Sequence, residues 1–256
     1  MATIAQLLRE AQASPRSDSW RVDTELLLME AMGCSRATLL TWPEREVPSA
    51  ALGRFEALLE RRRSGEPIAY LLGRRGFWDF ELRVSPAVLI PRPETELLVE
   101  LAIDAASARE GEQRIVDLGT GSGAIAIALA RANPRFRVTG VELSAPALAL
   151  ARENAARLAA NNLDFIEGSW LSEQVCRQLT EGSGAAPRVD MIVSNPPYIA
   201  DGDKNALPPE VREFDPPKAL FAGARGLDAQ GPLPGPLQTP IPHAPLPPPP
   251  LPPPPP

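Results

Sequence analysis

The 256-residue sequence contains very little histidine and cysteine. Its one histidine, His243, lies in the stretch from Gly231 to Pro256, which also holds 15 of the 31 prolines and no charged residue. Without histidine, the rest of the chain cannot form a Ser-His-Asp relay, an imidazole base or a histidine-ligated metal site. Cys34 and Cys176 are too few and too far apart for a disulfide framework or a cysteine cluster. We therefore expect a reducing compartment and no metal.

Long apolar runs are absent as well. No run approaches the length of about 18 residues that crosses a membrane, and residues 1–10 lack the basic and hydrophobic parts of a secretion signal. We therefore expect a cytoplasmic protein without membrane contact. The formal net charge of −6 argues against direct binding to nucleic acid.

The pattern of apolar residues divides the chain into four parts. Residues 1–72 have apolar side chains three and four positions apart, which predicts a small helical domain. In residues 73–93 the apolar side chains nearly alternate with others, and a glycine and a proline bound the segment, which predicts a β-hairpin linker. Residues 94–229 alternate β-branched runs with helical segments, which predicts an α/β domain with a parallel sheet. Residues 230–256 are proline-rich, and we expect them to be disordered or polyproline II.

Within the α/β domain, strands are expected at 114–118, 137–141, 164–167 and 189–194, and helices at 94–108, 122–132 and 144–160. In the helical domain, the apolar face of the second helix is expected to consist of Val22, Leu26, Leu27 and Met29. A basic cluster, which is either a solvated face or an aid to partner recognition, consists of Arg61, Arg62, Arg63, Arg74 and Arg75.

The turn after the first strand of the α/β domain is rich in glycine and reads Asp-Leu-Gly-Thr-Gly-Ser-Gly from Asp117 to Gly123. Glycines let the backbone turn tightly and let a ligand approach it closely, although such a turn alone is weak evidence for a site. Glu142 ends the second strand, where doubly wound folds place a carboxylate for ribose hydroxyls. An acid at Asp117 suits a cationic ligand such as a sulfonium better than a phosphate.

The fourth expected strand leads into Asn195-Pro196-Pro197-Tyr198. Two prolines in succession make this loop rigid, and the Asn195 side-chain oxygen and the Pro196 carbonyl can accept both N–H bonds of a planar NH₂ group. Such a group is a poor nucleophile, so orientation next to an activated methyl group would promote its reaction. Tyr198 would pack against the planar group. Trp170, just after the third strand, either flanks an adenine ring or fills the core.

Residues 67–228 resemble the bacterial peptide-chain release factor glutamine N5-methyltransferases, S-adenosylmethionine-dependent enzymes with a seven-stranded Rossmann-like sheet. The glycine turn and the Asn-Pro-Pro-Tyr loop also occur in methyltransferases of adenine and guanine amino groups. Two segments are more specific to this family: Glu-Pro-Ile-Ala-Tyr-Leu-Leu-Gly at 66–73, followed by Phe77-Trp78, and Leu-Ile-Pro-Arg-Pro-Glu-Thr-Glu at 89–96.

The resemblance implies methyl transfer from S-adenosyl-L-methionine to the glutamine of the Gly-Gly-Gln motif in class 1 peptide-chain release factors. The helical domain and the hairpin would recognise the release factor, and we expect a monomer. The implied cofactor-binding residues are Asp117, Gly119, Thr120, Gly121, Ser122, Gly123, Glu142, Trp170 and Asn195. The implied catalytic and substrate-binding residues are Asn195, Pro196, Pro197 and Tyr198.

The resemblance ends near Ala229. Family members continue with further strands and helices, whereas the proline-rich tail cannot supply the hydrogen bonds of a strand. We therefore expect a C-terminally incomplete sheet, an exposed fourth strand, poor folding and weak or no methylation by this chain. A shifted reading frame is the first explanation of the tail, and a ligand for SH3-like grooves is the second.

Two other functions remain open. An amino-methyltransferase acting on bases of rRNA or DNA would share the glycine turn and the Asn-Pro-Pro-Tyr loop. A nicotinamide-dependent dehydrogenase would share the turn and the acid at Glu142, but it would leave the loop unexplained.

Overall fold

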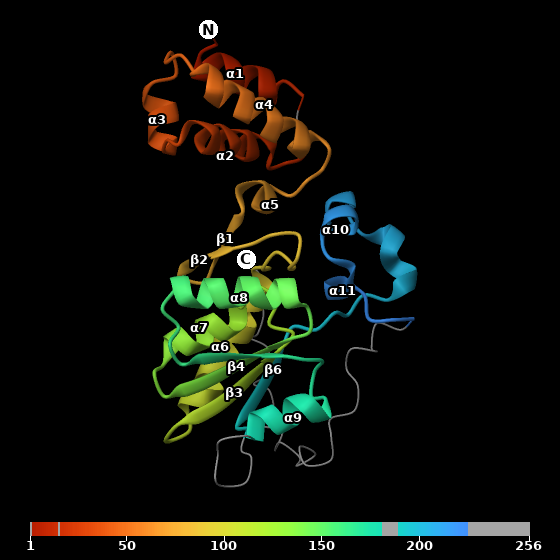
Figure 1. Cartoon of the computed structure of the whole chain (residues 1–256). Coiled ribbons are helices and arrows are strands. Elements are labelled where there is room, and N and C mark those ends of the chain that lie inside the picture. Colours follow the sequence, from red (N-terminus) through yellow and green to blue (C-terminus); the bar gives the residue numbers. More distant parts are fainter. Residues whose placement is uncertain (1, 15, 181–188, 225–256) are drawn as a thin grey trace, which may run out of the picture.

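The computed structural model describes residues 2–14, 16–180 and 189–224. The described residues form a helical domain, a short linker and an α/β domain (Figure 1). The α/β architecture and the helical domain before it confirm the predicted fold class. The expected tail at 230–256 lies outside the described residues. No helix in the part of the chain that the structure describes is long and apolar enough to span a membrane.

The helical domain consists of α1 (Ile4–Gln12), α2 (Trp20–Met32), α3 (Arg36–Thr41) and α4 (Ser49–Arg63). The helix α1 begins with a capping box in which Thr3 and Gln6 exchange hydrogen bonds between side chain and backbone. The buried indole of Trp20 donates a hydrogen bond of 2.8 Å to the carbonyl of Ala11. This domain therefore has its own apolar core.

The expected apolar face of α2 is wrong at Val22, which is 53% exposed. Because α2 packs against both α1 and α4, its buried side is rotated toward Trp20, Leu28 and Ala31.

The arginines of the expected basic cluster do not form one exposed surface. Arg62 is buried and forms an ion pair with Asp23, so it is not part of a solvated basic face.

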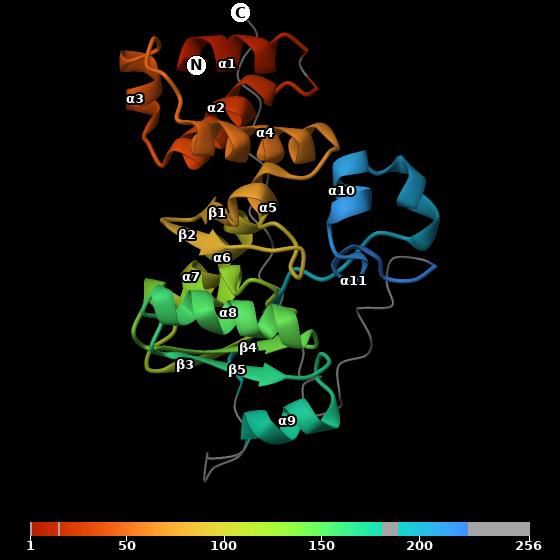
Figure 2. The same cartoon turned by 45° about the horizontal axis from the view of Figure 1, so that its top comes forward.

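The helix α5 (Ile68–Leu72) leads into the linker, which contains β1 (Arg74–Phe77) and β2 (Phe80–Arg83). The strands β1 and β2 pair antiparallel, which confirms the predicted hairpin. Phe77, Phe80 and Leu82 are buried in the same apolar cluster as the α/β domain. The hairpin therefore joins the α/β core, while α5 contacts α4 of the helical domain (Figure 2).

The α/β domain contains a parallel sheet with the strand order β5-β4-β3-β6. The strands are β3 (Gln113–Leu118), β4 (Phe136–Glu142), β5 (Leu163–Glu167) and β6 (Met191–Ser194). One face is covered by α6 (Glu94–Ser107), α7 (Ala124–Ala132) and α8 (Ala145–Arg157), and the other by α9 (Glu173–Thr180) (Figure 1). Ile115 packs into the apolar cluster that contains the hairpin, whereas Val116 and Leu118 pack with Val175 of α9.

The four predicted strands are confirmed, and within the described residues β6 is an edge strand, as expected for an incomplete sheet. The helix expected from Ser122 begins at Ala124, because Gly123 has a left-handed backbone. After β6, the structure adds three short helices that the sequence did not predict. They are η1 (Asp201–Ala206), α10 (Pro209–Phe214) and α11 (Pro217–Leu220).

Residues 199–223 form an arm whose end returns to its own beginning at Ile199. The amide of Ile199 donates to the carbonyl of Leu220, and the amide of Ala222 donates to the carbonyl of Ile199, both at 3.0 Å. These bonds close the arm at its base. The residues that follow the Asn-Pro-Pro-Tyr loop therefore lie beside the end of the arm.

Candidate active site

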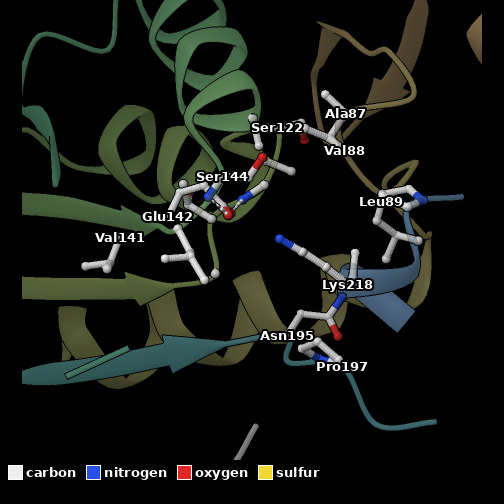
Figure 3. Close-up of a pocket in the computed structure, with 18 of the residues that line it drawn as sticks. Ala87, Val88, Leu89, Ser122, Val141, Glu142, Ser144, Asn195, Pro197 and Lys218 are labelled. Carbon is white, nitrogen blue, oxygen red and sulfur yellow. Dashed lines mark hydrogen bonds between the residues drawn. The ribbon is translucent and has the colours of Figure 1, made fainter. Parts of the chain in front are cut away.

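A cavity of about 960 Å³ opens at the carboxyl ends of the parallel strands (Figure 3). This edge of an open α/β sheet is where such folds bind ligands. The carboxyl ends of the four strands or the turns after them contribute to its lining: 119–122 after β3, 141–147 at the end of β4 and beyond it, 168–170 after β5, and Asn195 and Pro197 after β6.

The glycine turn is fixed by its backbone. The amides of Gly119 and Thr120 both donate to the carbonyl of Val141 on the neighbouring strand, at 2.9 and 3.0 Å. Gly123 has a φ of 84°, and a Cβ there would lie 3.0 Å from Ile127 Cδ1. Glycine is therefore required at this position both by conformation and by the close approach of α7.

Asp117 lies beneath the turn and is fully buried. One carboxylate oxygen accepts a hydrogen bond of 2.6 Å from the Thr120 hydroxyl, and Oδ1 has no hydrogen-bond partner. Burial raises the pKa of Asp117 to about 7, and the nearby charge of Glu142 adds to the rise, while the hydrogen bond from Thr120 opposes it. Asp117 therefore braces the turn from below and titrates near neutral pH.

Glu142 holds the turn from the side. Its two carboxylate oxygens accept hydrogen bonds of 2.9 Å from the backbone amides of Gly121 and Ser144. Each oxygen has a further lone pair, so the carboxylate can also accept two hydroxyl donors from the cavity. The arrangement suits a ribose, whose adjacent hydroxyls are such donors.

Trp170 lines the same part of the cavity. Its φ of 45° is rare for a residue with a side chain, and a Cβ on Gly119 would lie 4.0 Å from its ring. Left-handed backbone at a non-glycine residue costs on the order of 1 to 3 kcal/mol and often marks a functional site. The backbone thus holds the indole over the glycine turn.

The Asn-Pro-Pro-Tyr loop is attached to the centre of the sheet. The hydroxyl of Ser194 donates a hydrogen bond of 2.8 Å to the carbonyl of Leu118, which is near the start of the glycine turn. The side-chain amide of Asn195 donates to the Thr95 hydroxyl at 3.3 Å. With Nδ2 engaged in this way, Asn195 Oδ1 remains available as an acceptor.

Eight of the residues expected from the sequence line one cavity: Gly119, Thr120, Gly121, Ser122, Glu142, Trp170, Asn195 and Pro197. Four are not among its lining residues. Asp117 and Gly123 lie behind the turn, Pro196 lies between two lining residues, and the side chain of Tyr198 is 71% exposed.

Sequence reasoning missed the wall opposite Glu142. This wall comes from a proline-rich loop at residues 85–93 and from the arm. Figure 3 shows Leu89 and Lys218 of this wall on the same side of the cavity as Asn195, across from Glu142 and Ser144. The only sequence signal was the Leu-Ile-Pro-Arg-Pro-Glu-Thr-Glu segment, which was read as a family feature and not as a cavity wall.

Comparisons with known proteins agree with this geometry. Residues 2–73 match the family described as the PrmC N-terminal domain, and residues 94–208 match the methyltransferase small domain. A relative from Vibrio cholerae serotype O1, named Release factor glutamine methyltransferase, is 49% identical over 82% of this chain and 70% of its own length. A relative of the same name from Pseudomonas aeruginosa is 47% identical over 89% of this chain and 78% of its own length.

Among solved structures, a S-adenosylmethionine-dependent methyltransferase from Geobacter sulfurreducens, in complex with S-adenosyl-L-homocysteine, matches a shorter segment. It is 32% identical over 28% of this chain and 29% of its own, with a TM-score of 0.24.

Proposed function

This chain belongs to the release factor glutamine methyltransferase family, and on that premise we propose that it methylates the side-chain nitrogen of the Gly-Gly-Gln glutamine in class 1 peptide-chain release factors. The enzyme is a S-adenosylmethionine-dependent protein-glutamine N-methyltransferase. The observation that carries the proposal is that one cavity joins Glu142 and the glycine turn to Asn195.

The cavity fits S-adenosylmethionine, which supplies an activated methyl group. Glu142 would accept the ribose hydroxyls, and Trp170 would lie against the cofactor. The glycine turn leaves its backbone uncovered, and a Cβ on Gly121 would meet no atom closer than 4.0 Å. The negative charge that Asp117 gains as it ionises favours a cationic ligand.

The proposed reaction relies on orientation. Asn195 Oδ1 and the Pro196 carbonyl accept the two N–H bonds of the glutamine amide, which turns the nitrogen lone pair toward the methyl group. The same two acceptors stabilise the positive charge that develops on the nitrogen. Neither group is a base, so the proton leaves to water.

The test is mass spectrometry of a class 1 release factor after incubation with the purified chain and S-adenosylmethionine. We expect one added methyl group on the glutamine of the Gly-Gly-Gln motif, in only a small fraction of the release factor, because the sheet in the described residues is incomplete. Asn195→Ala should lower the rate by about 100-fold because the amide loses an orienting acceptor. A methyl group on rRNA or DNA bases, with an unmodified release factor, would instead support the alternative amino-methyltransferase.

The remaining parts of the proposal concern the setting of the reaction. We propose a monomer that works in the cytoplasm, without direct contact to nucleic acid, and that binds the release factor through residues 1–72 and the linker at 73–93. Sedimentation of the chain alone and mixed with a release factor tests the first and last of these points. A stable dimer would contradict the first point. Unchanged binding of the release factor by a variant altered only at exposed residues of 1–93 would contradict the last.

A further inference from the structure

The wall that sequence reasoning missed is assembled around one buried carboxylate. Asp215 follows α10, and its side chain is only 1% exposed. Arg92 of the proline-rich loop donates a hydrogen bond of 2.7 Å to Asp215 Oδ2. The hydroxyl of Tyr70, from α5, lies 2.8 Å from Asp215 Oδ1. Asp215 therefore connects the arm, the proline-rich loop and α5.

The Tyr70 hydroxyl has a second partner. It also lies 2.8 Å from the carbonyl of Val88, a residue that lines the cavity. A phenol has one proton, so Tyr70 can donate to only one of these two acceptors at a time. Both contacts can be hydrogen bonds at once only if Asp215 carries a proton. Burial raises the pKa of Asp215, against the effects of Tyr70 and Arg92. A protonated Asp215 would donate to Tyr70 while Tyr70 donates to Val88.

The segments tied together by Asp215 are those that form the wall. Val88 and Arg92 line the cavity from the proline-rich loop, and residues 216–219 line it directly after Asp215. The wall adjoins Asn195 and faces Glu142 across the cavity (Figure 3). It thus borders the place proposed for the glutamine amide and lies opposite the place proposed for the ribose.

We propose that Asp215 is a positioning residue that fastens the arm to the proline-rich loop and so holds the substrate-side wall of the cavity in place for methyl transfer. This inference rests on the proposed function and goes beyond it. The hydrogen bonds to Tyr70 and Arg92 carry the effect, and the negative charge as such does not. Loss of the fastening should therefore slow the reaction with little effect on cofactor binding.

The test compares four full-length variants. Asp215→Ala removes the whole fastening, and Tyr70→Phe removes only the hydroxyl. Asp215→Asn is the conservative variant, because its amide can donate to Tyr70 and accept from Arg92. Glu213→Gln is the matched control, since Glu213 is an exposed acid two positions away whose carboxylate pairs with the neighbouring Arg212.

With the release factor as substrate, we expect kcat to fall about 100-fold in Asp215→Ala and about 10-fold in Tyr70→Phe. Asp215→Asn and Glu213→Gln should stay within about threefold of the unchanged chain. The Kd of S-adenosylhomocysteine should change by less than about threefold in all four. Should Asp215→Ala fail to fold, Tyr70→Phe alone carries the test, because its ring packing is kept. A parallel loss of kcat and cofactor affinity, or equal damage by Asp215→Asn and Asp215→Ala, would overturn the proposal.

Hydrogen exchange provides a readout that needs no activity. In Asp215→Ala and Tyr70→Phe, the amides of residues 87–92 and 218–223 should exchange faster, while those of β3 and β4 stay protected. Unchanged exchange in both wall segments would refute the fastening. If the unchanged chain leaves the release factor unmethylated, the proposed function fails, and the exchange rates still decide whether Asp215 fastens the wall.

Discussion

Glu142 is a residue whose charge is satisfied by backbone amides alone. Gly121 and Ser144 each donate to one of its oxygens, so the carboxylate both fixes the glycine turn and faces the cavity. A single substitution therefore tests its binding role, because an amide at the same position keeps one acceptor and the side-chain shape.

Glu142→Gln should raise the Kd of S-adenosylmethionine by about 10-fold to 100-fold, since hydrogen bonds to a charged group contribute about 1.5 to 3 kcal/mol. Isothermal titration calorimetry measures the change. Glu167→Gln is the control, because Glu167 is the register partner of Glu142 on β5 and does not line the cavity. Equal weakening in both variants would contradict the binding role.

Asp117 predicts a pH dependence of stability. Its folded pKa of about 7 lies above the ordinary aspartate value of 3.8, so its contribution to stability is full below about pH 4 and is lost as the pH rises to about 7. Asp117→Asn removes this loss. The unfolding free energy of the variant, relative to the unchanged chain, should rise between pH 4 and 7 by on the order of a few kcal/mol and level off above 7. A pH-independent difference in urea titrations would exclude the shifted pKa.

At the scale of elements, the sequence predicted the strands and helices that have a regular apolar pattern, and it missed the short helices of the arm. β3, β4 and β5 were found because β-branched runs such as Arg114–Leu118 end at glycine or an acid. The arm was missed because α10 and α11 have only six and four residues and begin at prolines, so they show no periodicity. The wall of the cavity therefore could not be predicted, since long-range hydrogen bonds such as that from Arg92 to Asp215 create it.

The helix α6 exposes apolar side chains next to the edge of the sheet. Leu97 and Leu101 are 59% and 57% exposed, whereas Val99 between them is fully buried. Replacing both leucines by glutamine should change the unfolding free energy by less than about 1 kcal/mol and reduce aggregation on heating, as measured by light scattering. Val99→Ala should cost about 2 kcal/mol. A large loss of stability in the double variant would mean that these leucines are covered in solution.

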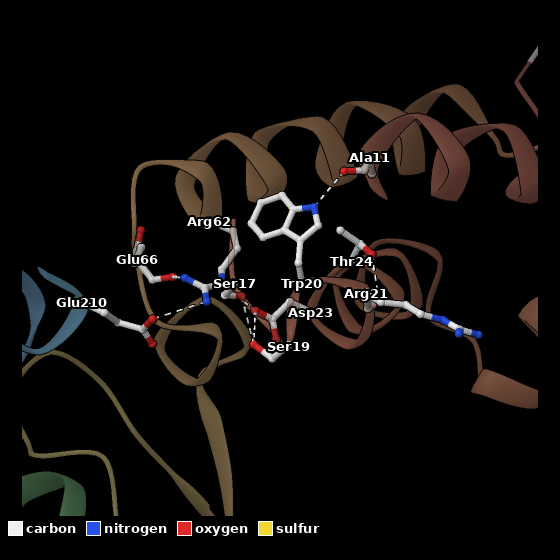
Figure 4. Close-up of polar contacts among 10 residues, drawn as sticks. All are labelled: Ala11, Ser17, Ser19, Trp20, Arg21, Asp23, Thr24, Arg62, Glu66 and Glu210. Atoms are coloured by element: carbon white, nitrogen blue, oxygen red, sulfur yellow. Dashed lines mark hydrogen bonds and ion pairs between the residues drawn. The ribbon is translucent and has the colours of Figure 1, made fainter. Parts of the chain in front are cut away.

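At the scale of the whole molecule, one arginine joins the helical domain to the arm. Arg62 of α4 pairs with Asp23 of α2 at 2.9 Å and with Glu210 of α10 at 3.4 Å (Figure 4). It also donates to the carbonyl of Glu66 at 3.3 Å. The domain expected to bind the release factor and the arm beside the cavity are thereby in direct contact.

Arg62→Met should lower the unfolding free energy by about 3 kcal/mol, because it leaves the buried carboxylate of Asp23 without its partner. Arg63→Met is the control, since Arg63 is 41% exposed and its pair with Glu60 spans 3.8 Å. Chemical denaturation of both variants measures the difference. Similar losses would show that the buried pair contributes nothing of its own.

The position of β6 sets the order in which the protein loses its properties on heating. Within the described residues, β6 has one hydrogen-bonded neighbour, whereas β3 has two. Edges of a sheet open at lower free energy than its centre, so the loop proposed to bind the glutamine should loosen before the turn proposed to bind the cofactor. Turnover should then stop at a lower temperature than S-adenosylhomocysteine binding, and simultaneous loss of both would contradict this order. Between the two temperatures the molecule is a nucleoside-binding protein that has ceased to be an enzyme.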